Sequence, residues 1–231
     1  MPGEREQMYA LLEAYFVNVT RTQFEQDLSE KEWVLLVADT STGHLQGFST
    51  LMLLQTVVTG RPVVAFFSGD TVVDRAYWGE TLLSRLWALH VFGLAERIRR
   101  NQPETQVYWF LISSGYKTYR FLSTFFREFY PVYDRPLPLA IRQTRDALAL
   151  LKFGMAYQPE RGVVRLPGAT PLRQGVADIT EQQLSDPHVA FFVAANPGHV
   201  DGDELACLAE IGPANLTPAG RRMLGLSRIG S

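Results

Sequence analysis

The residues best suited to chemistry lie in the stretch from Val63 to Ile98. Asp70 interrupts an apolar and aromatic run that has the character of a buried strand, and His90 stands between Leu89 and Val91 in a helical pattern. A carboxylate at such a break can bond to local backbone or act as a base, and a helical histidine can be a core residue or a base. For each residue both interpretations stay open.

The same stretch has the order strand, turn, helix. An apolar run from Val63 to Val73 leads through the turn residues 74–79 into a long amphipathic pattern. Backbone N–H groups at a helix start are unpaired, and the helix dipole adds positive potential there. The order therefore predicts a site for an anion or a thioester.

A second polar group follows the next apolar run. Tyr116, Lys117, Tyr119 and Arg120 open a helical pattern directly after Ser113-Ser114-Gly115. A plain amphipathic helix start would explain this cluster, and so would a site that uses a tyrosine as an acid. The later run 196–204 gathers histidine and acidic residues without a metal-ligand spacing, so we expect a loop there and no metal site.

Composition excludes several function classes. The 231 residues carry a formal net charge of −2 with scattered arginines, which argues against nucleic acid or an anionic membrane surface as partner. The single cysteine, Cys207, excludes an intramolecular disulfide, favours a reducing compartment and reads as a buried inert thiol. Neither a signal-peptide pattern nor an apolar run long enough for a membrane span is present, so we expect a cytoplasmic protein.

Apolar periodicity predicts the elements that position these residues. In order they are a helix over Glu4 to Asn18, a short helix near Phe24 to Leu28, strands over Trp33 to Ala38, Leu45 to Val58 and Val63 to Val73, a helix over about Arg75 to Arg100, a strand over Gln106 to Ser113, and helices over Tyr116 to Glu128 and Leu139 to Tyr157. Short turns between the first three strands imply an antiparallel meander, and the helix before the fourth implies a parallel pair.

Glycine and proline become frequent after Gln158. The best strand candidates there are Val163 to Leu166 and His188 to Val193, residues 202–208 read as a short helix or strand, and residues 212–231 read as a surface tail. The chain thus divides into a core of residues 1–157 and a C-terminal extension of residues 158–231 packed on it.

The order of elements over roughly Met8 to Pro131 resembles the GNAT acyltransferase fold, an α+β (α/β) fold with a mixed, mostly antiparallel central sheet flanked by helices. The family's turn after its fourth strand commonly reads V-x-P-x-Y-R-G-x-G-x-G, and here Val73, Tyr77 and Gly79 keep their places. Trp78 stands where Arg or Gln is usual, and Thr81 and Leu83 stand where glycines are usual.

These departures bear on the donor. In the family, glycine lets backbone N–H groups approach the coenzyme A pyrophosphate. Side chains at Thr81 and Leu83, together with Glu80, weaken that cradle, which favours an acyl-phosphopantetheine thioester on an acyl carrier protein over standard acetyl-CoA. The alternative is a domain that has lost its donor and binds a ligand or a partner. Ser114 occupies roughly the place of a family Asn, and Phe125 or Phe126 the place of the usual acid, a Tyr.

The resemblance implies an N-acyltransferase that moves an acyl group, of medium or long chain among others, from acyl-CoA or an acyl-carrier thioester to a primary amine of a small molecule or peptide. It extends more weakly to GNAT-like maturases that fatty-acylate peptides and to N-acyl amino acid synthases. Asp70 or His90 would be the base, and Tyr116 or Tyr119 the acid. The predicted donor-binding residues are Thr71, Val73, Tyr77, Trp78, Gly79, Glu80, Thr81 and Ser114. The C-terminal extension could form the acceptor site, and no metal is expected.

Overall fold

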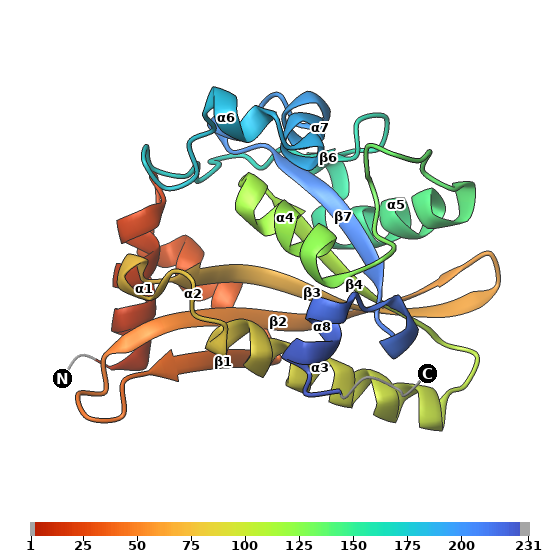
Figure 1. Cartoon of the computed structure of the whole chain (residues 1–231), viewed down its shortest axis with the longest axis horizontal. Helices are drawn as coiled ribbons and strands as arrows, with labels where there is room; N and C mark the ends of the chain where they lie inside the picture. The colour runs from red at the N-terminus through yellow and green to blue at the C-terminus, as the bar shows by residue number, and fades with distance from the viewer. Residues whose placement is uncertain (1–2, 227–231) are drawn as a thin grey trace.

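A computed structural model describes residues 3–226 and contains one seven-stranded sheet with helices on both faces (Figure 1). The strands are β1 (Trp33–Ala38), β2 (Leu45–Val58), β3 (Arg61–Val73), β4 (Gln106–Ser113), β5 (Tyr157–Gln158), β6 (Val163–Val164) and β7 (Glu204–Glu210). They lie in the order β1-β2-β3-β4-β7-β6-β5. Only the β3–β4 pair is parallel. The mixed α+β, mostly antiparallel sheet predicted from the sequence is therefore confirmed.

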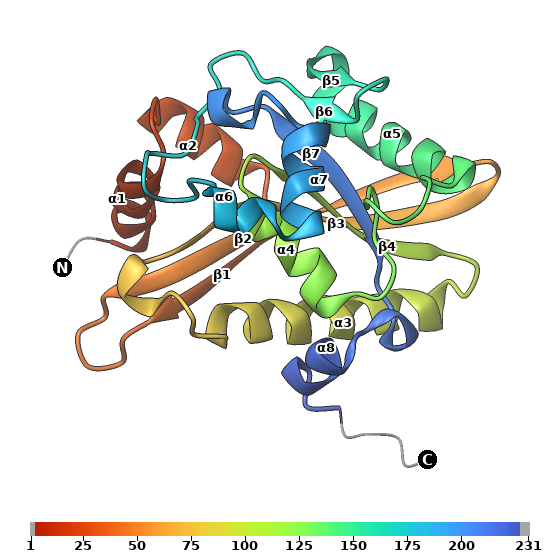
Figure 2. The same ribbon diagram turned by 45° about the horizontal axis from the view of Figure 1, so that its top comes forward.

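Helices cover both faces of the sheet (Figures 1 and 2). They are α1 (Glu4–Tyr15), α2 (Arg21–Ser29), α3 (Leu82–Asn101), α4 (Tyr116–Phe125), α5 (Leu139–Phe153), α6 (Glu181–Leu184), α7 (Pro187–Ala195) and α8 (Pro218–Met223), with 3₁₀ turns η1 (Arg75–Tyr77), η2 (Gly154–Ala156), η3 (His199–Asp201) and η4 (Pro213–Asn215). The apolar side chains of α3, α4 and α7 share one core with the sheet, while α1, α2 and α5 bury the other face. None of these helices combines the length and apolar character needed to cross a membrane.

The antiparallel meander and the parallel crossover both match the sequence analysis. Several predicted helices end a few residues early, and two elements differ in kind or in their start. The long helix begins at Leu82 rather than near Arg75, because residues 75–77 form a 3₁₀ turn and Gly79 adopts a φ of 102°, which an α-helix cannot accommodate. The run His188 to Val193, predicted as a strand, lies inside helix α7.

The C-terminal part of the chain contributes a strand to the sheet. The sequence predicts that residues 158–231 pack on the core as an extension, and in the structure β7 lies between β4 and β6 inside the sheet. Leu205, Cys207 and Ala209 of β7 belong to the same buried cluster as Trp109 of β4. The predicted tail contains η4 and α8, and its last residues, 227–231, lie outside the described part of the chain.

Candidate active site

The strands β3 and β4 diverge before either one ends. Their parallel pairing runs from Val63 opposite Gln106 to Ser68 opposite Leu111 and stops there. β3 stays paired with β2 as far as Val73, and β4 stays paired with β7 as far as Ser113. Beyond this point the two central strands no longer pair with each other. The backbone N–H and C=O groups on their facing edges therefore make no hydrogen bonds between the two strands.

A β-bulge lies where this divergence begins. Ser49 and Leu51 of β2 pair with Thr71 and Ser68, so two residues of β3, Gly69 and Asp70, share the space opposite one residue of β2. A side chain at Gly69 would force its neighbours to move, because a methyl group there would lie 2.6 Å from the Thr50 hydroxyl oxygen and 2.7 Å from Cε of Lys31. The Lys31 side chain therefore passes close to the backbone of the bulge, next to Asp70.

Asp70 lies in a charged setting beside α2. It is half-buried, and burial raises its pKa to about 6, with the nearby Asp27 adding to the rise and Lys31 opposing it. The Lys31 ammonium donates to the Asp27 carbonyl at 2.7 Å, and burial is the main cause that lowers its pKa. A carboxyl with a pKa near 6 is ionised at neutral pH and still takes up a proton readily, which suits a general base.

A second carboxyl, Glu204, faces the same region from the first residue of β7. It lies on the same face of the sheet as Ala206 and Leu208, which pack against α5. Burial, and then the charge of Asp70, raises the pKa of Glu204 to about 8. The Asp70 and Glu204 carboxyls therefore both lie at the diverging strands. At neutral pH Asp70 favours the ionised form and Glu204 the protonated form.

The opposite face of the divergence is closed by an indole pair. Trp87 of α3 and Trp109 of β4 both donate from Nε1 to the Ser68 hydroxyl, at 3.1 and 2.9 Å. Their rings lie 4.5 Å apart between centroids, and all three residues are buried. These two hydrogen bonds fix Ser68, the last residue of β3 that pairs with β4. The two strands therefore separate at a rigid position.

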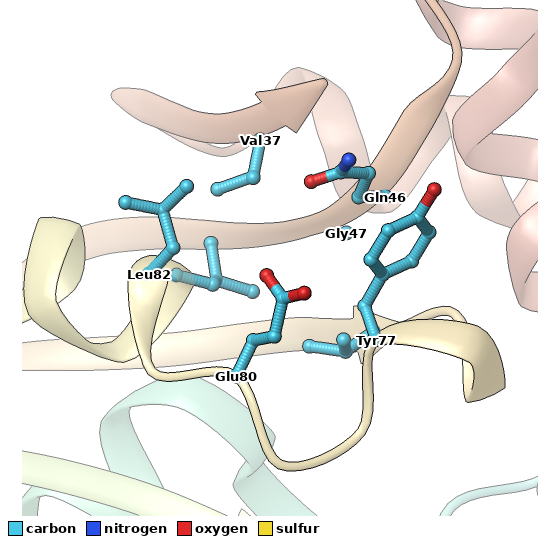
Figure 3. A pocket seen from close by; sticks show the side chains of 8 residues that line it. Val37, Gln46, Gly47, Tyr77, Glu80 and Leu82 are labelled. Atoms are coloured by element: carbon cyan, nitrogen blue, oxygen red, sulfur yellow. The ribbon is translucent and has the colours of Figure 1, made fainter. Parts of the chain in front are cut away.

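The turn between β3 and α3 is folded against the ends of β1 and β2. Figure 3 shows a small pocket lined by side chains that include Val37, Gln46, Tyr77, Glu80 and Leu82. Its free space is about 10 Å³, the room of one water molecule. Thr81 precedes α3 without a side-chain cap. This pocket cannot hold a pyrophosphate, and the Glu80 carboxylate would repel one.

Trp78 occupies the free edge of β3. Its indole Nε1 donates to the Val73 carbonyl at 2.8 Å. The Asp74 N–H bonds to β2 through the Gln46 carbonyl, and successive strand amides point to opposite sides, so Val73 and Thr71 direct theirs toward β4. The Thr71 side chain is tied to the Ser49 hydroxyl at 2.8 Å. Trp78 therefore covers part of the edge of β3 that faces β4.

The two predicted tyrosines have different surroundings. Tyr116, at the start of α4, is half-buried and its hydroxyl accepts a hydrogen bond from Gln183 Nε2. Tyr119 is fully buried among phenylalanines, its hydroxyl donates to the Pro131 carbonyl at 2.9 Å, and burial strongly raises its pKa. Tyr119 therefore acts in packing, whereas Tyr116 lies next to Ser114 and the end of β4.

His90 lies away from the diverging strands. Its ring contacts Trp33 of β1 edge-on, with centroids 5.3 Å apart, and burial lowers its pKa. β1 is two strands from β3, and α3 covers the face opposite the one that Asp70 shares with α2. Of the two bases predicted from the sequence, the structure brings only Asp70 to the divergence.

Comparison with known proteins gives weak similarities. No protein-family model matches the chain, and no curated protein matches its sequence. Among solved structures, a probable N-acyltransferase from Enterococcus faecalis V583 is 18% identical, with a TM-score of 0.41 over 55% of this chain and 30% of that protein, so this chain spans about a third of its length.

Two further structures extend the comparison. An acetyltransferase from Trypanosoma brucei is 19% identical, with a TM-score of 0.35 over 59% of this chain and 94% of that one. A GCN5-related N-acetyltransferase from Sphaerobacter thermophilus is 12% identical, with a TM-score of 0.36 over 96% and 87% of the two chains. Similarity at this level carries no conclusion about activity, so function must be argued from the residues themselves.

Sequence reasoning missed Glu204 and Lys31 as neighbours of Asp70. The signal for Glu204 was the short continuous apolar run from Leu205 to Ala209 that follows it, which is consistent with a strand buried on both faces. Nothing in the sequence indicated that this strand lies next to β4. Among residues 3–226, no three histidine, cysteine or acidic side chains are grouped so as to hold a metal ion.

Proposed function

We propose that this protein is an N-acyltransferase that moves an acyl group from a thioester to a primary amine at the diverging ends of β3 and β4. The observation that carries the proposal is the combination of a free strand edge at Thr71 and Val73 with the half-buried Asp70 carboxyl at the bulge. A thioester aligned on that edge would have its carbonyl oxygen polarised by a strand N–H.

The chemistry then needs no covalent enzyme intermediate. The amine nitrogen attacks the thioester carbon, a C–N bond forms, and the C–S bond breaks. Asp70 takes a proton from the amine, and the departing thiolate leaves as a thiol after receiving a proton, for which Tyr116 is the remaining candidate donor. The Asp70 carboxylate, which is ionised at neutral pH, also favours a cationic amine as acceptor over a neutral nucleophile.

The finer assignments follow the same reasoning. The donor is acyl-CoA or an acyl-phosphopantetheine thioester, and the small, acidic pocket beside Glu80 favours a carrier-protein donor without a pyrophosphate. The acceptor is a small molecule or peptide amine, and residues of the C-terminal segment, Glu204 among them, form part of its site. A fatty-acyl donor is compatible with the aromatic side chains near β4.

The test is the Asp70→Asn variant. Purified protein is incubated with acyl-CoA or acyl-carrier protein and a panel of primary amines, and acylated products are followed by mass spectrometry and thiol release. For wild-type protein, kcat/KM should rise with pH through about 6, where Asp70 loses its proton. Asp70→Asn should lower turnover by about 10²–10⁴-fold and remove that limb.

The matched control is Asp201→Asn, an isosteric change at an exposed aspartate of η3. It should leave turnover and the pH profile unchanged. Equal turnover of Asp70→Asn and wild-type protein would refute the assignment of the base.

A catalytically silent acyl-binding module is the second candidate. The hydrogen bond from Trp78 to the Val73 carbonyl favours it, since that bond occupies part of the edge a thioester would use. Thermal-shift measurements with acyl-CoA and acyl-pantetheine, run beside the turnover assay, separate the two. Stabilisation by a thioester without any acylated amine across the panel would support the silent module.

A further inference from the structure

One loop segment closes the open end of the diverging strands. This segment, residues 169–176, is called the strap; it belongs to the connection between β6 and α6 and passes from α1 to α4 (Figure 2). On the α1 side, the Arg173 amide donates to the Tyr15 carbonyl at 2.8 Å and the Val17 amide donates to the Pro171 carbonyl at 2.9 Å. Near α4, the Leu172 side chain would lie 3.0 Å from a methyl group at Gly115.

Two cations hold the other end of the strap. The Arg75 guanidinium donates to the Gly175 carbonyl at 2.8 Å, and the Lys117 ammonium donates to the Val176 carbonyl at 2.6 Å. Arg75 comes from the turn after β3 and Lys117 from the first turn of α4 after β4. The strap therefore bridges the two strand ends through cationic side chains.

The same two cations meet on one indole ring. The Lys117 ammonium lies 4.0 Å from the centroid of the Trp78 ring, and the Arg75 guanidinium carbon lies 5.1 Å from it. Burial, and then the charge of Arg75, lowers the pKa of Lys117, and the charge of the nearby Asp178 opposes this shift. Within residues 3–226, neither cation forms an ion pair with a carboxylate, and both donate to neutral carbonyls. Like charges held together on neutral acceptors favour an anion between them.

The backbone at this point adds to the attraction. Helix α4 is ten residues long, Lys117 is its second residue, and its N-cap residue Gly115 provides no side-chain cap. Unpaired amides and the helix dipole at such a terminus stabilise negative charge. By contrast, the turn before α3 offers only about 10 Å³ beside the Glu80 carboxylate. An anion reaching this edge of the protein is therefore drawn to α4 and not to α3.

We propose that Arg75 and Lys117, with Trp78 between them, bind the phosphate of a phosphate ester, and that this phosphate takes the place of the Gly175 and Val176 carbonyls and releases the strap. Under the proposed function, on which this assignment of the ester rests, the phosphate is that of the pantetheine arm of the donor. Binding would then uncover the free edge of β3 only when the correct donor is present. The strap couples recognition of the phosphate to access of the thioester.

The first test compares 4′-phosphopantetheine with pantetheine, which differ only in the phosphate. Isothermal titration calorimetry at fixed ionic strength should show wild-type protein binding the phosphorylated form at least about tenfold more tightly. Arg75→Gln and Lys117→Gln should each remove most of that preference. Arg97→Gln, at an exposed arginine further along α3, is the matched control and should retain it. Equal affinity of wild-type protein for the two compounds, or no binding of either, would overturn the proposed site.

The second test follows the strap itself by hydrogen exchange. The amides of Val17 and Arg173 form the hydrogen bonds between the strap and the end of α1. They should exchange faster when 4′-phosphopantetheine is bound, and their exchange rates should not change with pantetheine. Inorganic phosphate, tested at the same ionic strength, shows whether the ester or the phosphate alone opens the strap. Unchanged exchange with 4′-phosphopantetheine bound would refute strap release.

These readouts do not depend on turnover. Phosphate-dependent binding and strap release without acylated product would leave this inference standing and remove the proposed function. If the Lys117→Gln variant instead showed turnover with an unchanged KM for the donor, the proposed function would stand and this inference would be refuted.

Discussion

Replacing Glu204 by glutamine should change how stability depends on pH. Folding raises the pKa of this carboxyl from its ordinary value of 4.5 to about 8. Between these two values the folded protein retains a proton that the unfolded chain has lost, so the free energy of unfolding falls as pH rises through this window. Glutamine has the same shape as glutamate and does not titrate. In the Glu204→Gln variant, the free energy of unfolding should therefore no longer show this decline with rising pH.

The size of the effect follows from the pKa values. The raised pKa corresponds to an upper limit of about 5 kcal/mol, at about 1.4 kcal/mol for each pKa unit. Glu204 is only half-buried, and solvent screening reduces the effect to about 2 kcal/mol. Near pH 5 the variant and the wild-type protein should have similar stabilities. At pH 9 the variant should be more stable by about that amount.

Urea unfolding at both pH values measures this difference. The matched control is Glu210→Gln, at an exposed glutamate at the other end of the same strand. It should leave the pH dependence of stability as in wild-type protein. A Glu204→Gln variant whose stability declines with pH as steeply as that of wild-type protein would refute the reasoning that this carboxyl is protonated and desolvated in the folded state.

Other predictions follow from single contacts. Ser68→Ala leaves two buried indole N–H groups unpaired and should lower the free energy of unfolding by about 2–4 kcal/mol in urea, whereas Ser84→Ala at a half-buried helix position should change it little. Tyr119→Phe should lower stability by about 1 kcal/mol through loss of the bond to Pro131, with turnover in the amine assay unchanged. A hundredfold loss of turnover in Tyr119→Phe would restore Tyr119 as the acid.

Local patterns predicted much of the fold. The turns at residues 39–43 and 59–62 indicated the meander, and the long amphipathic run before Gln106 indicated the parallel crossover. The run His188 to Val193 shows where a pattern failed, because a short apolar run fits a strand or a buried helix. Asp186 caps α7 by accepting from the His188 amide at 2.9 Å, and Pro187 occupies its first turn. Those two residues were the overlooked signals.

The candidate site was less predictable because it depends on contacts between distant segments. Asp70 was singled out as a break in a strand, but its neighbours Lys31 and Glu204 come from opposite ends of the chain. Arg75 and Lys117 belong to separate turns, and only the divergence of β3 and β4 brings both to the Trp78 ring. Periodicity reports which face of an element is buried, and it contains no information on which elements meet.

The position of β7 has a consequence for biosynthesis. This strand, from the last part of the chain, pairs with β4 along Tyr108 to Ser113 and completes the buried cluster around Trp109. During translation β4 therefore emerges long before its partner and presents an apolar edge that other chains can pair with. A nascent chain stays prone to aggregation until residues 204–210 have left the ribosome, so the yield of folded protein depends on how well that edge is protected in the meantime.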